Sequence, residues 1–326
     1  MARVAVTGAA GFIGAYLTRA LAAQGHEVVA VDNLIRGRAS RLDAVADSIE
    51  IVNVDVRDTD GLANAFRGVD AVFHLAAVNG TENFYTRPAL VLDVGVRGAL
   101  AVTEASIAAG VADLVVASSA EVYQTPAVVP TPETVPMVIP DPLQPRYSYG
   151  GSKLISELIA FNYGRDRLDK VQVFRPHNVY GPDMGWKHVI PQLVAKAAAA
   201  VASGSGAVEL QGDGSETRAF CYVDDIVDGI LTMWQRGESM NVYHIGSPHE
   251  VSIADLARTV NAAVGAPDLA LVPGPASPGG TPRRCPDVSK LGLLGYAPKV
   301  GLEQGVAVTA EWYLAHPGAD ETNTLL

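Results

Sequence analysis

The strongest constraint on the fold is an alternation, in the first half of the chain, of short apolar runs with longer segments of helical periodicity. The apolar runs are mostly β-branched, are bounded by Gly, Asp or Asn, and lie at residues 4–7, 27–31, 51–54, 71–75 and 114–117. Between them, residues 12–24 and 90–110 carry apolar side chains at helical spacing. Repeated strand-helix-strand units require parallel pairing with right-handed crossovers. The sequence therefore predicts an α/β fold, a doubly wound parallel sheet with helices on both faces.

Composition argues against several classes of partner. The chain has 326 residues, of which 48% are apolar, and a formal net charge of −11, whereas general binding to nucleic acid or membrane surfaces needs a basic face. Its two cysteines, Cys221 and Cys285, provide neither a disulfide framework nor a paired-cysteine zinc site, and the histidines show no ligand spacing. No charged leader with a long apolar stretch precedes the first strand, and no segment reaches the roughly 18 to 20 apolar residues of a membrane span. We therefore expect a cytoplasmic protein without a metal, a nucleic-acid partner or a membrane partner.

A glycine-rich turn follows the first strand and opens the first helix, with the sequence Thr7-Gly8-Ala9-Ala10-Gly11-Phe12-Ile13-Gly14. Glycines there allow a tight turn and let backbone N–H groups approach a pyrophosphate, which the helix amino terminus stabilises. Asp32 ends the second strand 18 positions after Gly14, close to the spacing of about 20 at which an acid binds an adenosine ribose. A carboxylate repels a 2′-phosphate, so NAD is preferred, although Arg36 and Arg38 nearby leave NADP open. Asp55 and Val56, after the third strand, either flank the adenine or simply start a loop.

Tyr149 and Lys153 are four residues apart in a helical run at residues 147–164, so both side chains lie on one helix face. A phenol titrates near 10, so acid/base work at neutral pH needs a shift of about 3 units, or about 4 kcal/mol. A neighbouring ammonium and a nicotinium ring could supply it. This spacing also occurs on solvated helix faces. The segment Ser118-Ser119-Ala120-Glu121-Val122-Tyr123, which follows the fifth strand at the carboxyl edge of the sheet, favours the catalytic interpretation.

These segments together resemble the extended short-chain dehydrogenase/reductase family, and within it the nucleotide-sugar epimerases, dehydratases and decarboxylases. Matching segments occur in family order from residue 4 to about residue 300: residues 7–14, 32–33, 55–58, 74–77, 118–123, Tyr149 with Lys153, 175–182, 212–214 with Arg218, 222–225, and 286–288 near Arg284. Two positions depart from the family pattern, because Gly95 stands where Asn is frequent and Gln124 where Gly is frequent.

The resemblance implies a role for each matching residue. Ser119 and Tyr149 would contact the sugar hydroxyl that is oxidised, with Tyr149 as base and Lys153 holding Tyr149 and the nicotinamide ribose. Hydride would pass to NAD and leave a keto sugar. The implied NAD contacts are Gly8, Gly11, Phe12, Ile13, Gly14, Asp32, Asn33, Asp55, Val56, Leu75, Ala76, Ala77, Ser118, Tyr149, Lys153 and Pro176. The implied contacts with the nucleotide-diphosphate sugar are Ser119, Asn178, Arg218 and Arg284, and guanidinium forks do match phosphate oxygens.

The residues beside Ser119 narrow the choice of chemistry. The 4,6-dehydratases that resemble this chain have an Asp-Glu pair where it has Ala120-Glu121, so dehydration is not expected. Decarboxylases have Ser-Glu, which Glu121 matches, and 3,5-epimerases of GDP-mannose have a cysteine at the Glu121 position. C4 epimerisation through a transient 4-keto sugar needs only Ser119, Tyr149 and Lys153. We therefore expect a C4 epimerase, with Glu121 as a further candidate catalytic residue.

Three alternatives stay open: a 3,5-epimerase, a UDP-glucuronate-type decarboxylase, and a non-catalytic NAD-binding sensor. The intact Ser119, Tyr149 and Lys153 argue against the sensor. We expect residues 1–176 and 214–246 to form the NAD-binding Rossmann domain, and residues 177–213 and 247–326 a smaller nucleotide-sugar-binding lobe. Because the family usually dimerises through the helices at residues 90–110 and 147–164, we also expect a homodimer.

Overall fold

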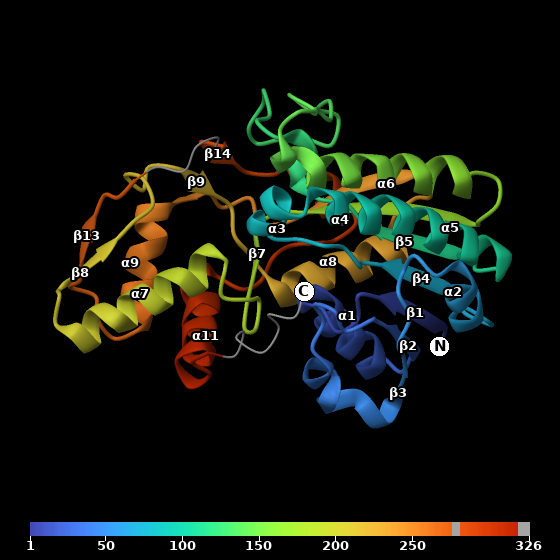
Figure 1. Cartoon of the computed structure of the whole chain (residues 1–326), viewed down its shortest axis with the longest axis horizontal. Coiled ribbons are helices and arrows are strands. Elements are labelled where there is room, and N and C mark those ends of the chain that lie inside the picture. Colours follow the sequence, from blue (N-terminus) through green and yellow to red (C-terminus); the bar gives the residue numbers. More distant parts are fainter. Residues whose placement is uncertain (276–280, 319–326) are drawn as a thin grey trace.

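Seven parallel strands form the central sheet, in the order β11-β6-β5-β4-β1-β2-β3. Figure 1 labels β1 to β5, on the right of the picture. They are β1 (Arg3–Thr7), β2 (Glu27–Val31), β3 (Ile49–Val52), β4 (Ala71–His74), β5 (Asp113–Ala117), β6 (Lys170–Pro176) and β11 (Asn241–Ile245). The computed structural model describes residues 1–275 and 281–318. All pairs in this sheet are parallel, which confirms the predicted doubly wound α/β fold. β3 starts two residues earlier than predicted, because Ile49 pairs with Val28 of β2.

Alternation along the strands sends side chains into two cores, one on each face of the sheet. On β1, Val4 and Val6 enter one core and Ala5 enters the other. The first core is closed by α1 (Phe12–Ala23) and α8 (Val223–Arg236). The second is closed by α2 (Thr59–Ala65), α5 (Gly98–Ala108) and α6 (Ser148–Gly164). Because helices cover both faces of the sheet, a ligand can bind at the ends of the strands.

The helix predicted at residues 90–110 is a continuous run of three segments. α4 (Pro88–Leu92) leads into a wide π-helical turn, η2 (Asp93–Arg97), and then into α5. A Cβ at Gly95 would lie 2.7 Å from Ser152 Oγ of α6, and Ser156 Oγ donates a hydrogen bond of 3.2 Å to the Gly95 carbonyl. The departure from the family pattern at Gly95 therefore allows close packing of η2 against α6.

A smaller lobe lies beside the sheet, at the left of Figure 1. It contains α7 (Val189–Ser203), α9 (Ile253–Ala263), α11 (Leu302–Ala315) and the parallel pair β8 (Ala207–Glu209) and β13 (Ala270–Val272). Its core includes Leu193, Leu256 and Val306. A small sheet of β12 (Val251–Ser252), β9 (Thr217–Arg218) and β14 (Arg283–Arg284) and a parallel pair of β7 (Val179–Tyr180) and β10 (Cys221–Tyr222) connect this lobe with the rest.

The predicted domain boundaries stay a prediction. α8 and β11 lie with the large sheet, as the assignment of residues 214–246 expects, but β9 from the same range pairs in the small sheet. Residues 276–280 and 319–326 of the predicted lobe lie outside the described residues. The remaining short helices are η1 (Ala39–Ser48), α3 (Thr81–Thr86), η3 (Ala120–Tyr123), η4 (Pro145–Tyr147) and α10 (Ser289–Gly292).

Both cysteines are free and buried. Within residues 1–275 and 281–318, no helix is long and apolar enough to cross a membrane. In the same residues, no cluster of three His, Cys, Asp or Glu side chains could hold a metal ion.

Candidate active site

The glycine-rich turn lies at the switch point of the sheet, where β1 neighbours both β2 and β4. Gly8 has a positive φ of 74°, and a Cβ there would lie 2.8 Å from the backbone nitrogen of Ala76, just after β4. A Cβ at Gly14 would lie 2.0 Å from the Gly8 carbonyl oxygen. This crevice therefore admits backbone only, at the amino terminus of α1. Such a cradle fits a dinucleotide pyrophosphate, and it brings together the predicted contacts Gly8, Gly11, Phe12, Ile13, Gly14, Leu75, Ala76 and Ala77.

Asp32 lies directly after β2, as predicted for the acid that binds the adenosine ribose. Its carboxylate accepts hydrogen bonds from the backbone N–H of Ala10 (2.9 Å) and of Leu34 (2.8 Å). Burial raises the pKa of Asp32, and this effect is larger than that of the two N–H groups, which lower the pKa. Each carboxylate oxygen keeps a second lone pair for a ribose hydroxyl. Arg38, which left NADP open, forms an ion pair with Asp183.

Asn33, Asp55 and Val56 lie at the ends of β2 and β3, on the side where the adenine would be. Asn33 Nδ2 donates to Asp55 Oδ2 at 3.0 Å. Arg57 donates to Asp55 from Nε (2.8 Å) and Nη2 (2.7 Å), and these bonds hold the pKa of Asp55 to about 2. Val56 is buried in the core closed by α2 and α5. These contacts describe a structured loop start, and a contact with adenine stays a prediction.

The fold brings Ser119, Tyr149 and Lys153 together at the carboxyl end of β5. Ser119 caps η3 and accepts a hydrogen bond from the Glu121 N–H at 3.2 Å. Lys153 Nζ, from α6, donates to the Ala117 carbonyl at 2.7 Å and lies 5.9 Å from the centroid of the Tyr149 ring. Burial raises the pKa of Tyr149 to about 12, while a hydrogen bond with Ser119 lowers it. Burial lowers the pKa of Lys153 to about 8, so its ammonium form still dominates at pH 7.

Phe84 is a neighbour of Tyr149 that the sequence did not reveal. It lies on α3 and stacks on the Tyr149 ring, with centroids 4.9 Å apart and planes 14° apart. This contact contributes to the burial of Tyr149, which is 8% exposed. No local pattern connects the two residues, so only the tertiary structure could identify the contact.

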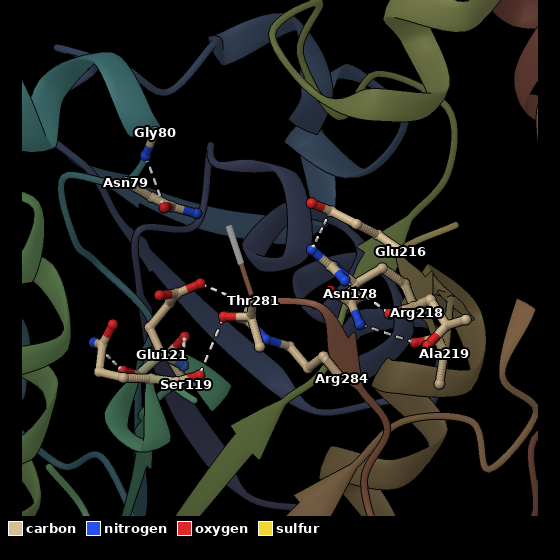
Figure 2. A network of polar contacts seen from close by, with 12 residues as sticks. Asn79, Gly80, Ser119, Glu121, Asn178, Glu216, Arg218, Ala219, Thr281 and Arg284 are labelled. Atoms are coloured by element: carbon tan, nitrogen blue, oxygen red, sulfur yellow. Dashed lines mark hydrogen bonds and ion pairs between the residues drawn. The ribbon is translucent and has the colours of Figure 1, made fainter. Parts of the chain in front are cut away.

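Glu121 forms an ion pair with Arg284, and these two residues lie close to Ser119 and Thr281 (Figure 2). Arg284 Nη1 donates to Glu121 Oε1 at 2.6 Å, and Arg284 Nη2 donates to Thr281 Oγ1 at 3.3 Å. Burial raises the pKa of Glu121, but the charges of Arg284, Arg146 and Arg218 outweigh this effect and hold the pKa below its usual value. Arg146, in η4, was not predicted. Glu121 is therefore an anion among cations.

The predicted diphosphate contacts also converge. Arg218 of β9 and Arg284 of β14 are register partners in parallel strands, so their side chains leave the small sheet side by side. Asn178 Nδ2 donates to the Ala219 carbonyl at 3.2 Å, beside Arg218, as Figure 2 shows. Arg218 Nη2 donates to Glu216 at 2.9 Å. This arrangement offers two guanidinium groups and an amide to an anionic group.

Ser118, Pro176 and Gln124 complete the set of sequence-derived positions. Ser118 and Pro176 lie at the carboxyl ends of the neighbouring strands β5 and β6. Gln124 directly follows η3 and has a positive φ of 53°, a conformation that favours glycine. Its backbone carbonyl accepts a hydrogen bond from Thr281 at 3.3 Å. Gln124 therefore has a positive-φ backbone of the kind that would favour the family's glycine at this position.

The chain belongs to the NAD dependent epimerase/dehydratase family, which it matches over residues 4–246. It is 34% identical to a UDP-glucose 4-epimerase of Mycolicibacterium smegmatis over 95% of this chain and 98% of the relative. It is 32% identical to UDP-glucuronic acid decarboxylase 1 of Xenopus tropicalis over 95% of this chain and 72% of the relative. A dTDP-glucose 4,6-dehydratase from Streptomyces venezuelae, solved with NAD bound, superposes with a TM-score of 0.86 at 31% identity, covering 98% of this chain and 99% of that chain. The family resemblance and the prediction of NAD are confirmed: the protein is an enzyme of an NAD-dependent family that modifies nucleotide sugars.

Proposed function

We propose that this protein is a nucleotide-sugar C4 epimerase that works through a transient 4-keto sugar. The observation that carries the proposal is the assembly of Ser119, Tyr149 and Lys153 beside a Glu121 that is already held in an ion pair with Arg284. C4 epimerisation needs only the first three residues, because the ketone rotates and is reduced from its other face.

In the proposed reaction Tyr149 accepts the proton of the sugar hydroxyl and later returns it. Burial places its pKa at about 12, so work near pH 7 needs a decrease of about 5 units, or about 7 kcal/mol. The Lys153 ammonium contributes part of this decrease, since opposite charges at close range shift a pKa by about 1 to 3 units. Ser119 orients the hydroxyl. NAD, when bound, supplies a hydride acceptor and a positive nicotinamide ring.

Arg218, Arg284 and Asn178 support the proposal of a nucleotide-diphosphate substrate. A guanidinium presents a planar fork of donors that matches two phosphate oxygens. Arg284 shares its Nη1 with Glu121, and Arg218 shares its Nη2 with Glu216. A diphosphate bound here therefore competes with two carboxylates of the chain.

The alternatives are weaker for reasons seen in the site. Ala120 offers no acid for dehydration. A 3,5-epimerase needs a base that exchanges ring protons, and Glu121, with a lowered pKa and an ion pair, is a poor one. A specific observation does favour one second candidate, decarboxylation of a nucleotide-linked uronic acid. Three arginines act on the Glu121 position, a setting that suits a substrate carboxylate, and one relative is a UDP-glucuronic acid decarboxylase.

The test is product NMR after incubation of the purified protein with UDP-, GDP-, ADP- and dTDP-linked sugars, uronic acids included. We expect a mixture of C4 epimers with every carbon retained. Tyr149→Phe is the matched control, which should bind NADH like the parent but turn over about a hundredfold to ten-thousandfold more slowly. Release of carbon dioxide would establish the decarboxylase instead. NADH binding without turnover of any sugar would contradict catalysis and support the sensor.

We also propose the homodimer expected from the sequence. Three large apolar side chains of α6 are exposed: Ile155, Leu158 and Tyr163. Analytical ultracentrifugation should give twice the mass of one chain, and Leu158→Lys should shift the equilibrium towards monomer. A parent protein that sediments as a monomer at micromolar concentration would contradict the proposal. The cytoplasmic location stays a prediction.

A further inference from the structure

A third side chain lies on the helix face that carries Tyr149 and Lys153. Glu157 follows Lys153 by four residues, so the three side chains stack along one face of α6 at about 5 to 6 Å between neighbouring Cβ atoms. Glu157 is 2% exposed, although a carboxylate is rarely buried so fully unless it is paired. The proposed reaction uses Tyr149 and Lys153 but assigns no role to Glu157.

Three donors hold the Glu157 carboxylate. Arg175 of β6 makes a bidentate contact with it: Nε donates to Oε1 at 2.8 Å and Nη2 donates to Oε2 at 2.6 Å. Ser118 Oγ, at the end of β5, also donates to Oε1. Because these donors come from two adjacent strands, the carboxylate fixes the catalytic face of α6 against the carboxyl edge of the sheet.

The same network continues to the segment that carries Ser119. Arg175 Nη1 donates to the Tyr123 hydroxyl, which also shares a hydrogen bond of 2.7 Å with His244 Nε2 of β11. Tyr123 is the last residue of η3, and Ser118 directly precedes its capping residue, Ser119. The residues from Ser118 to Tyr123 are therefore tied to Glu157 and Arg175 at both ends.

Glu157 is also the anionic neighbour of the Lys153 ammonium. The groups that face Lys153 are Glu157 and Tyr149 of α6, the Ala117 carbonyl of β5, and His74 of β4. Burial keeps His74 neutral, with a pKa of about 3. Burial disfavours the charged form of Lys153, and Glu157 opposes that effect.

We propose that Glu157 is a positioning residue, which Arg175 holds in place so that it fixes the Ser118–Tyr123 segment and provides the counter-charge for Lys153. The inference rests on the proposed roles of Ser119, Tyr149 and Lys153. Its test measures the ionisation of Lys153 alone, which needs neither a substrate nor turnover. A wrong proposal about the reaction would therefore leave this result unchanged.

The experiment is an NMR titration of protein labelled with ¹³C-lysine. The chain has six lysines, so a Lys153→Met spectrum assigns the Lys153 signal. In Glu157→Gln we expect the Lys153 midpoint to fall by about one pH unit or more, the usual effect of a lost opposite charge. The matched control is Asp225→Asn on α8, because Asp225 is also 2% exposed and accepts hydrogen bonds from the N–H groups of Lys299 and Val300. This control should leave the midpoint unchanged.

A second variant covers the case in which Glu157→Gln does not fold with an unpaired Arg175. Glu157→Met/Arg175→Met removes both charges together and should also lower the Lys153 midpoint. A midpoint within about 0.2 units of the parent in either folded variant would overturn the counter-charge role. Failure of both variants to fold, with Asp225→Asn folded, would show that Glu157 serves stability only and would likewise overturn the proposal.

Discussion

Replacement of Glu121 by glutamine separates C4 epimerisation from its nearest competitors. The substitution keeps the shape of the side chain. In the parent, the Glu121 carboxylate accepts a hydrogen bond of 2.6 Å from Arg284 Nη1, and the glutamine amide oxygen can still accept it. It removes the charge, and with it any capacity to exchange a proton with the sugar. In the proposed epimerase Tyr149 moves the one proton that the reaction requires, so Glu121 has none to transfer.

The contact itself sets the expected size of the effect. A hydrogen bond to a charged partner contributes about 1.5 to 3 kcal/mol and a neutral one about 0.5 to 1.5 kcal/mol. The substitution therefore removes about 1 to 1.5 kcal/mol of local interaction, which limits the loss in kcat to roughly tenfold. Because Arg284 is released from an ion pair, KM should stay the same or fall. A lost acid or base would instead reduce turnover by about a hundredfold to ten-thousandfold.

The assay is product NMR in deuterated water for the parent and for Glu121→Gln. We expect no deuterium at any ring carbon, every carbon retained and turnover within about tenfold of the parent. Glu216→Gln is the matched control, since it releases Arg218 in the same way but away from Ser119. Ring deuterium, loss of carbon dioxide, or a loss of more than about a hundredfold that Glu216→Gln does not share would refute the assignment.

Three further predictions address the cofactor and the stability of the fold. Asp32→Asn should weaken NADH binding by about 10- to 100-fold and NADPH binding by less, and fluorescence titration that shows equal losses would contradict the ribose assignment. Gly14→Ala, whose Cβ would lie 2.0 Å from the Gly8 carbonyl oxygen, should abolish NADH binding, whereas Gly151→Ala, in α6 with its nearest neighbour at 3.6 Å, should not. His177 is 1% exposed, both ring nitrogens have no hydrogen-bond partner in the described part of the chain, and burial depresses its pKa well below 6.5. As the pH drops below about 6.5, His177 is protonated in the unfolded state before it is protonated in the folded state, so the free energy of unfolding falls. His177→Phe should therefore raise the free energy of unfolding by about 1 to 3 kcal/mol at pH 7 and by more at pH 5. Urea unfolding that shows no larger gain at pH 5 than at pH 7 would contradict this prediction.

Most of the sheet could be predicted from the sequence, because β1 to β5 each carry their own local signal. A parallel strand buried on both faces is a short, continuous apolar run, and the runs at residues 27–31 and 114–117 lie within β2 and β5. The boundaries of β3 depend on its pairing with β2, which is not local. The π-helical turn around Gly95 was missed for the same reason, since Gly95 packs against Ser152 on another helix and no local pattern marks the turn.

Convergence of the candidate site was also predictable, because residues that follow parallel strands meet at one edge of the sheet. Ser119 after β5 and Asp32 after β2 follow this rule. Phe84, Arg146 and Thr281 were missed, because each contacts a site residue that is far away in the sequence: Tyr149, Glu121 and Gln124 respectively. Glu157 did have a local signal, its spacing of four residues from Lys153.

Exposure separates the ion pairs near the site into two kinds. Glu121 is paired with Arg284, and Glu216 is paired with Arg218. The side chains of the two glutamates are 26% exposed for Glu121 and 42% exposed for Glu216. Each can turn to water when an anion takes its arginine, so both arginines can be given up to a diphosphate at modest cost. The Glu157 side chain is 3% exposed and that of Arg175 is 4% exposed, so breaking this pair would leave either charge buried without an opposite charge. We therefore expect substrate binding to rearrange the first two pairs and to leave the third intact. The two arginines proposed to bind a diphosphate would then move, while Glu157 and Arg175 behind Lys153 would stay fixed.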